Sequence, residues 1–129
     1  MYYLTALVTL LAVLFYLVTG LNVGRARHKY VIQAPATTGN PDFERAFRVQ
    51  MNTLEWLPIF LPSLWLFAVY ISDAGAAAIG LIWVIGRVLY FVGYIRAAEK
   101  RGVGFMIQML ASAVLFLGAI GAVAWRLIA

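Results

Sequence analysis

The sequence predicts an all-α membrane protein that crosses the bilayer four times as a single domain over residues 1–129. Hydrophobic residues make up 64% of the chain and charged residues only 12%, whereas soluble domains are about half apolar and about a quarter charged. The apolar residues form four long runs, each reaching the roughly 20 residues that a transmembrane helix requires. These runs do not alternate and are much longer than the ~10 residues of a barrel strand, so helices fit them better than strands.

The first helix is predicted at about 2–23 and the second at about 43–71. No Lys or Arg precedes the first apolar run, so we expect a retained helix and not a signal peptide. The connection between them, 24–42, is long and polar. Asn40 can cap the second helix, with Pro41 at its first position.

The third helix is predicted at about 75–98 and the fourth at about 103–128. A tight turn at Ser72–Gly75 joins the second helix to the third. Gly102 stands between the third and fourth helices, where it is expected to be a helix C-cap. Four helices joined in this way form a bundle with both termini on the same side of the membrane.

The net charge of +5 does not point to nucleic acid, because the basic residues gather at the ends of apolar runs. By the positive-inside rule these residues place both basic loops in the cytoplasm and both termini outside. The short C-terminal end after the fourth helix makes a bacterial inner membrane the expected location. The chain has no cysteine and one histidine, so no metal site is expected. The basic residues predicted on one side are Arg25, Arg27, Lys29, Arg45, Arg48, Arg96, Lys100 and Arg101.

Two polar stripes run through the predicted second and third helices. At 100° per residue, Arg45, Arg48, Asn52 and Glu55 fall within about 80° on the second helix, and Arg87, Tyr90, Tyr94 and Arg101 within about 60° on the third. Glu55 and Arg87 are at similar depths, about 18 Å and 21 Å from the basic ends of their helices, so they are expected to pair. A stripe with more arginine than acid favours an anionic, water-soluble ligand, although a purely structural clamp is the alternative.

Two motifs then indicate a family. The first comprises Thr37-Thr38-Gly39, Phe43-Glu44-Arg45, Arg48, Gln50, Asn52 and Glu55, and the second Gly86-Arg87, Tyr90-Phe91, Gly93-Tyr94 and Lys100-Arg101. Together they resemble the membrane-associated proteins of eicosanoid and glutathione metabolism, the MAPEG family, in its microsomal glutathione transferase and leukotriene C4 synthase branch.

The resemblance implies a homotrimer that binds glutathione as a co-substrate between adjacent subunits. It implies a glutathione transferase or peroxidase acting on a lipophilic electrophile or lipid hydroperoxide from the membrane lipid. Arg101 matches the arginine that stabilises the glutathione thiolate. The implied glutathione contacts are Arg27, Arg48, Gln50, Asn52, Glu55, Tyr90 and Tyr94.

Two positions depart from the leukotriene synthase pattern, and two other functions compete. Trp56 replaces a tyrosine and His28 replaces an arginine, which argues against leukotriene synthesis itself. A non-catalytic lipid-binding scaffold of the same family is one alternative, and the presence of Arg101 disfavours it. A small multidrug exporter is the other, and it is disfavoured because its essential acid would lie in the first helix, which here has no ionisable residue before Arg25. The cluster around Arg25 and Lys29 is alternatively a topology signal that contacts lipid headgroups.

Overall fold

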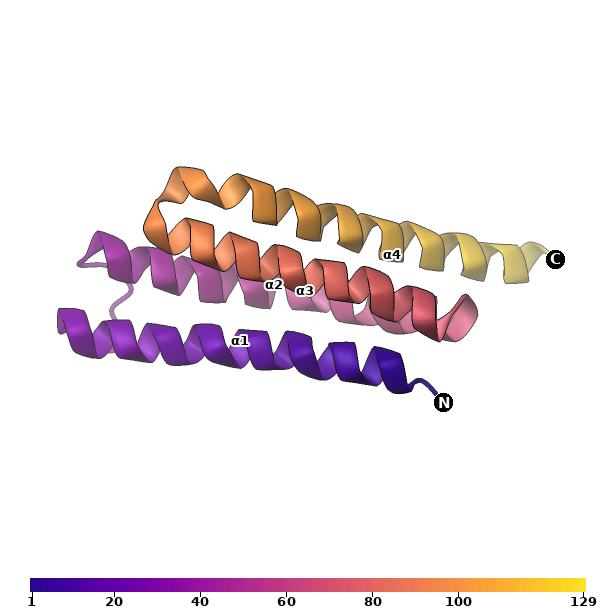
Figure 1. Cartoon of the computed structure of the whole chain (residues 1–129), viewed down its shortest axis with the longest axis horizontal. Helices are drawn as coiled ribbons and strands as arrows, with labels where there is room; N and C mark the ends of the chain where they lie inside the picture. Colours follow the sequence, from indigo (N-terminus) through magenta and orange to yellow (C-terminus); the bar gives the residue numbers. More distant parts are fainter.

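The computed structural model describes all 129 residues as an antiparallel bundle of four long α-helices (Figure 1). The helices are α1 (Tyr3–Tyr30), α2 (Pro41–Tyr70), α3 (Asp73–Arg96) and α4 (Gly102–Ile128), with a short 3₁₀ turn, η1 (Ala98–Arg101), before α4. All four are long and apolar enough to cross a membrane. The predicted fold class of a four-helix, multi-pass membrane bundle is therefore confirmed.

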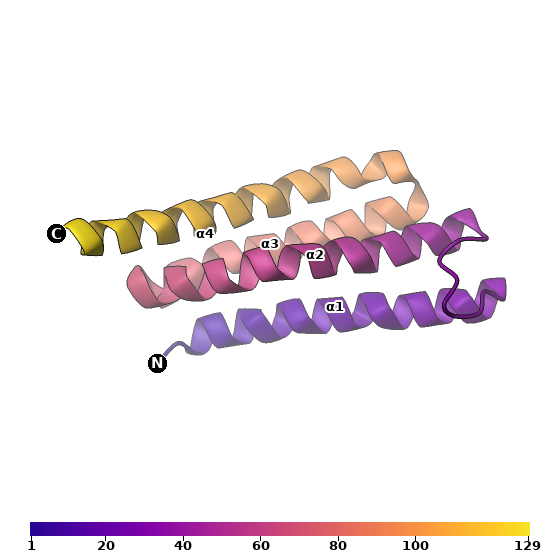
Figure 2. The same ribbon diagram turned by 180° about the vertical axis from the view of Figure 1, so that it is seen from behind.

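Both termini lie at one end of the bundle, and the α1–α2 and α3–α4 connections lie at the other (Figures 1 and 2). We call the end with these connections the basic end, because the cations from Arg25 to Lys29 and from Arg96 to Arg101 are found there. The arrangement places the two connections side by side, as the charge pattern predicted.

The helix α1 is two turns longer than predicted. It continues to Tyr30, so the cations from Arg25 to Lys29 lie on a helix and not in a loop. Cations in the last turn are favourable there, because they face the negative end of the helix dipole. The helix ends at Val31, which adopts a left-handed conformation with φ of 55°. The connection to α2 is therefore only Val31–Asn40.

The start of α2 follows the predicted capping. The side chain of Asn40 accepts hydrogen bonds from the backbone of Asp42 at 2.8 Å and of Phe43 at 3.2 Å, with Pro41 as the first helical residue. At the other end of the bundle, the Ser72 hydroxyl accepts a hydrogen bond from the backbone of Gly75 at 2.9 Å and caps α3. Local sequence therefore sets both helix starts.

The link between α3 and α4 differs from the prediction. The helix α3 ends at Arg96, Ala97 is extended, and Arg101 lies on η1 and not on α3. Gly102 is the first residue of α4 and has a right-handed φ of −62°. A C-cap glycine needs a left-handed conformation, so the C-cap prediction for Gly102 is wrong.

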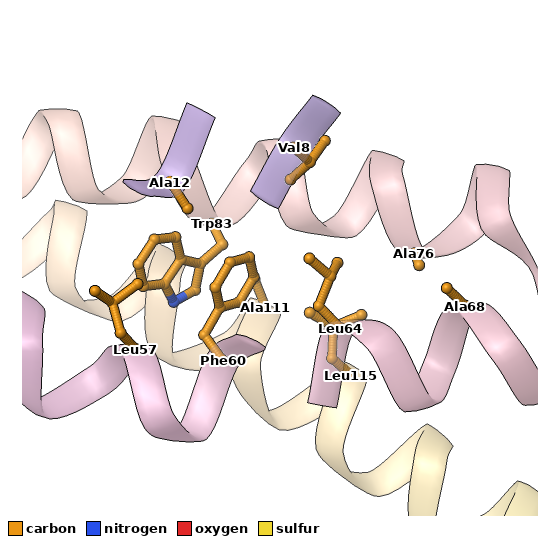
Figure 3. Packing of buried hydrophobic residues seen from close by; sticks show 10 residues of the cluster. All are labelled: Val8, Ala12, Leu57, Phe60, Leu64, Ala68, Ala76, Trp83, Ala111 and Leu115. Carbon is orange, nitrogen blue, oxygen red and sulfur yellow. The ribbon is translucent and has the colours of Figure 1, made fainter. Parts of the chain in front are cut away.

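The core of the bundle is a small aromatic and aliphatic cluster shared by all four helices (Figure 3). Its centre is Trp83, which stacks on Phe60 with ring centroids 3.9 Å apart and planes at 6°. Val8 of α1 and Leu115 of α4 complete it from the two remaining helices. Only 28 of the 129 residues are buried, so most of the apolar surface faces outward, as expected for helices whose surroundings are lipid or neighbouring subunits.

Candidate functional site

Polar side chains of α2 and α3 meet η1 and the beginning of α4 in the half of the bundle nearer the basic end. We call this group the polar cluster. Its helices are long and apolar enough to cross a membrane, so each polar atom in it must find a partner or a wet opening. The cluster consists of Arg48, Asn52, Thr53, Glu55, Arg87, Tyr90, Tyr94 and Arg101.

Arg87 is the buried centre of the polar cluster. Its side chain is fully buried, and it donates hydrogen bonds to Asn52 Oδ1 at 2.8 Å and to Thr53 Oγ1 at 2.6 Å. Its guanidinium carbon lies 4.4 Å from the centroid of the Tyr90 ring and 5.9 Å from that of Trp83. Neutral acceptors and aromatic faces of the same chain therefore hold this cation, and no carboxylate contacts it.

The expected pairing of Glu55 with Arg87 is wrong. Glu55 instead accepts a hydrogen bond from Arg48 at 2.7 Å, one of two ion pairs in the chain. Arg87 bonds Asn52 and Thr53 in the interior of the bundle, whereas Glu55 is more than half exposed and bonds Arg48. The depth prediction was sound, but the two side chains point in different directions.

The Arg48–Glu55 pair lies on the open surface of the single chain. The side chains of Arg48 and Glu55 are 46% and 56% exposed. Glu55 lies about 21 Å along α2 from Pro41, which is deep within a bilayer. A charge left at such a depth against lipid costs at least ~2.5–3.5 kcal/mol, so this face requires water, a ligand or a second protein surface.

An aromatic wall connects the polar cluster to α4. The Tyr90 and Tyr94 rings lie 5.4 Å apart, and the Tyr90 ring lies 6.0 Å from Phe105 of α4. Phe105 meets Trp56 edge to face at 5.7 Å. The guanidinium carbon of Arg101 lies 5.5 Å from the centroid of the Tyr94 ring, and its side chain is exposed. Arg101 stands at the rim of this wall, where it donates a hydrogen bond to the Ala98 carbonyl at 2.5 Å and has no carboxylate partner.

Close packing of α3 on α4 positions the wall. A Cβ added to Gly104 would overlap the backbone nitrogen of Tyr90, and one added to Gly86 would lie 2.8 Å from the backbone nitrogen of Gln108. A Cβ at Gly93 would overlap the backbone oxygen of Lys100. These glycines let the two backbones touch, which brings η1 back over α3 and places Arg101 beside Tyr94.

Arg27 and Gln50 lie apart from the polar cluster. The Gln50 side chain faces α1, where its Nε2 would lie 3.1 Å from a Cβ added to Gly20. Gln50 is about 160° around α2 from Asn52, so the two cannot serve one pocket within a single chain. Arg27 lies in the last turn of α1, donates to the Ala36 carbonyl at 2.7 Å and sits 4.9 Å over the Phe43 ring.

The structure thus brings together six of the eight predicted site residues and separates two. It adds two that the sequence reasoning missed. Thr53 was missed because a threonine in an apolar helix commonly bonds its own backbone, and its hydroxyl does also donate to the Val49 carbonyl at 2.7 Å. Phe105 was missed because one aromatic residue among many carries no pattern. His28 is exposed on α1.

The family model of MAPEG matches residues 5–121 of the chain, which include the polar cluster and most of all four helices. The chain belongs to the MAPEG family. The MAPEG relatives include an uncharacterized protein of Synechocystis sp., which is 56% identical over 122 residues and covers 95% of this chain and 89% of its own.

Two further MAPEG relatives carry names that describe an activity. Microsomal glutathione S-transferase 2 of Homo sapiens is 47% identical over 102 residues, which is 78% of this chain and 69% of the relative. Leukotriene C4 synthase of Cavia porcellus is 45% identical over 98 residues, which is 76% of this chain and 65% of the relative. The chain is therefore similar to the branch of MAPEG proteins that its two motifs indicated.

Proposed function

We propose that this protein is a membrane-bound glutathione transferase that activates glutathione as a thiolate for attack on lipophilic electrophiles. The carrying observation is one continuous face of α2. This face holds the exposed Arg48–Glu55 pair and, further along the helix, leads into an apolar groove between α2 and α4. A water-soluble anion and a lipophilic molecule could therefore meet on the same face of one helix.

The apolar groove has a volume of about 780 Å³, within the range of about 300–1,000 Å³ that is typical of small-molecule sites. Pro58, Pro62 and Leu66 line it from α2, and Phe116 and Ile120 line it from α4. The three α2 residues lie within about 60° of Glu55 around the helix. This continuity supports delivery of an electrophile from the bilayer to a thiolate held near the polar cluster.

The free groups of the polar cluster match the charges of glutathione, which has two carboxylates, one ammonium and a thiol. Arg48 suits a carboxylate through a bidentate, charge-assisted hydrogen bond, and Glu55 suits the ammonium. Within the chain these two side chains neutralise each other at 2.7 Å. Glutathione would replace each partner with an opposite charge of its own, so neither side chain would lose its pairing. Asn52, Tyr90 and Tyr94 supply hydrogen-bonding groups for the peptide bonds.

Arg101 is the proposed catalytic residue. A guanidinium near a thiol lowers the pKa of the thiol from ~8.5 toward neutrality, because it stabilises the thiolate. The thiol proton passes to water, and the thiolate sulfur then forms a bond to the electrophilic carbon. The electron pair of the breaking bond leaves with the displaced group. With a lipid hydroperoxide the sulfur would attack oxygen, and a second glutathione would complete a peroxidase reaction.

The separation of Arg27 and Gln50 from the polar cluster supports a site shared by two chains. One subunit would provide Arg48, Glu55 and Arg101, and the α1–α2 face of its neighbour would provide Arg27 and Gln50. A neighbouring subunit would also cover the deep charges on α2 that lipid cannot solvate. A homotrimer closes such a head-to-tail contact into a ring without leaving an unpaired surface.

The proposed placement puts the basic end in the cytoplasm, where glutathione is available, and both termini outside. Eight of the ten Lys and Arg residues lie at the basic end, which is the asymmetry that the positive-inside rule uses. A bacterial inner membrane remains the proposed location.

The decisive experiment titrates the detergent-solubilised protein with glutathione and follows thiolate absorbance in the ultraviolet. We expect saturable binding with thiolate formation near neutral pH. Arg101→Ala should bind glutathione but raise the pKa of the bound thiol. Arg96→Ala, which removes an exposed cation of the same end outside the polar cluster, is the matched control and should behave as the unsubstituted protein.

Each alternative has its own outcome. Absence of binding at millimolar glutathione would refute the enzyme. Binding without thiolate formation would favour the non-catalytic scaffold. A bound thiol whose pKa is unchanged by Arg101→Ala would refute the role of that residue, whereas an equal change with Arg96→Ala would assign the effect to general surface charge.

The shared site can be tested by complementation. Chains with Arg27→Ala and Gln50→Ala, and chains with Arg48→Ala, should each bind glutathione weakly as homo-oligomers. When the two are co-expressed, mixed oligomers contain some intact sites and should recover part of the binding. If mixed oligomers bind no better than either parent, the site lies within one chain.

A further inference from the structure

A second polar pocket lies at the basic end, on a part of the surface that the proposed glutathione site does not use. It has a volume of about 220 Å³ and is formed where the end of α1 approaches the start of α2 and the end of α3. This volume is below the roughly 300–1,000 Å³ of complete small-molecule sites, so it suits one headgroup better than a whole ligand. Its lining is Asn22, Arg25, Ala26, Lys29, Tyr30, Asp42, Ala46 and Ile95.

The pocket carries unbalanced positive charge. Neither Arg25 nor Lys29 forms an ion pair within the chain. The single carboxylate in the lining, Asp42, is already engaged, because it forms an ion pair with Arg45 and accepts a hydrogen bond from the Tyr30 hydroxyl at 3.3 Å. Two cations are therefore free to bind an anion there, with the Asn22 amide as a further donor.

Farther from the basic end than the pocket, α1 and α3 carry exposed apolar side chains. On α1, Val18 lies within about 40° of Asn22, Arg25 and Lys29 around the helix. On α3, Val88 lies within about 20° of Ile95. Val18 and Val88 are exposed at 42% and 41%.

The two helices are in contact close to these valines. Phe15 of α1 and Phe91 of α3 meet edge to face at 6.0 Å. Arg25 and Lys29 thus stand at the basic end, and exposed apolar side chains of the same two helices lie below them, where hydrocarbon can pack.

We infer that this pocket binds the phosphate headgroup of an anionic phospholipid whose acyl chains lie along the exposed apolar side chains of α1 and α3. A free phosphate would use the same cations but would gain nothing from these apolar side chains. The apolar face beneath the cations is therefore the reason for choosing the lipid. Arg27 takes no part, because it lies about 160° from Arg25 around α1 and faces the opposite side of the helix.

The test measures lipid binding to the purified, full-length protein by native mass spectrometry. The probes are phosphatidylglycerol and phosphatidylcholine with identical acyl chains, added to delipidated protein in detergent. We expect a clear preference for phosphatidylglycerol. Arg25→Gln combined with Lys29→Gln should weaken phosphatidylglycerol binding roughly 30-fold, since each cation near the membrane surface contributes about fivefold. Binding of phosphatidylcholine should change little.

The matched control combines Arg96→Gln with Lys100→Gln, which removes the same charge from the same end outside the pocket. It should leave the preference for phosphatidylglycerol close to that of the unsubstituted protein. Equal weakening by both double variants would overturn the inference in favour of diffuse surface attraction. So would equal binding of the two lipids.

A third arm separates lipid from free anion. Inorganic phosphate and chain-free glycerol phosphate at millimolar concentration should not displace bound phosphatidylglycerol. Displacement by either compound would show a free-phosphate site and refute the lipid assignment. Glutathione binding should be unaffected by the Arg25 and Lys29 substitutions, so this test stands apart from that of the proposed enzyme.

Discussion

Replacing Gly104 with alanine should separate α3 from α4. The added Cβ would overlap the backbone nitrogen of Tyr90 and would lie 2.6 Å from the backbone oxygen of Gly86. Both obstacles are main-chain atoms of a helix, which cannot move aside as a flexible side chain could. Extra methyl groups in close-packed interiors typically destabilise by 1–3 kcal/mol, and we expect about 2–3 kcal/mol here, at the upper end of that range.

The matched control is Gly102→Ala, two residues earlier in the same chain. A Cβ at Gly102 meets no atom within 4 Å, and its φ of −62° is compatible with alanine. This substitution should be neutral or stabilise by up to ~1 kcal/mol, because alanine reduces the freedom of the unfolded chain. Both variants add one methyl group, so the difference between their unfolding free energies measures the cost of the contact between α3 and α4.

The assay is reversible unfolding in mixed micelles of mild detergent and sodium dodecyl sulfate, followed by tryptophan fluorescence. Trp83 reports on the core beside the α3–α4 contact. Gly104→Ala should unfold at a distinctly lower dodecyl sulfate fraction than Gly102→Ala. It should also weaken glutathione binding, because separation of the helices moves Phe105 from Tyr90. Equal unfolding midpoints for the two glycine variants would refute backbone contact between α3 and α4.

Three further substitutions test other contacts. Asp73→Ala should lower the unfolding midpoint. The Asp73 carboxylate, at the start of α3, caps α1 because it accepts hydrogen bonds from the backbone and hydroxyl of Thr5 at 2.9 and 2.6 Å. Asp73→Asn should recover part of the loss. Arg48→Ala should change the free energy of unfolding by only ~0.2–1 kcal/mol, as is typical of exposed ion pairs, and should weaken glutathione binding. A large loss of stability would instead show that the pair of Arg48 with Glu55 is structural. Gly93→Ala should lower thiolate formation more than glutathione affinity, because it displaces the turn that carries the proposed catalytic arginine; an unchanged thiolate signal would contradict this.

Much of the candidate site could be predicted from the sequence. The motif residues from Phe43 to Glu55 were placed on α2 and those from Gly86 to Tyr94 on α3, as the structure has them, whereas Arg101 was placed on the third helix and lies on η1. The hydrogen-bond partners of these polar side chains were less predictable. Arg87 was expected to pair with an acid, but it donates to Asn52 and Thr53 and lies against two aromatic faces, and its buried Nε has no hydrogen-bond partner.

Among the helix ends, too, some were predicted correctly from the sequence and others were not. Asn40 caps α2 as expected, because a cap depends on side chains within three residues of each other. Gly102 was misassigned, because the short link from α3 to α4 is shaped by a distant contact, that of Gly93 with the backbone of Lys100. A glycine needed for close approach and a glycine needed for a left-handed turn look alike in a sequence.

By itself, the sequence determined four membrane crossings, a basic end and the depth of each polar residue, since these follow from apolar length, charge position and helical rise. The tertiary structure alone decided the direction in which each polar side chain points. It buried Arg87 inside the bundle, left Glu55 on the surface and turned Gln50 toward α1. The physical reason is that helix azimuth depends on which faces pack together, and here glycine contacts between α3 and α4 contribute to that packing as much as any apolar stripe.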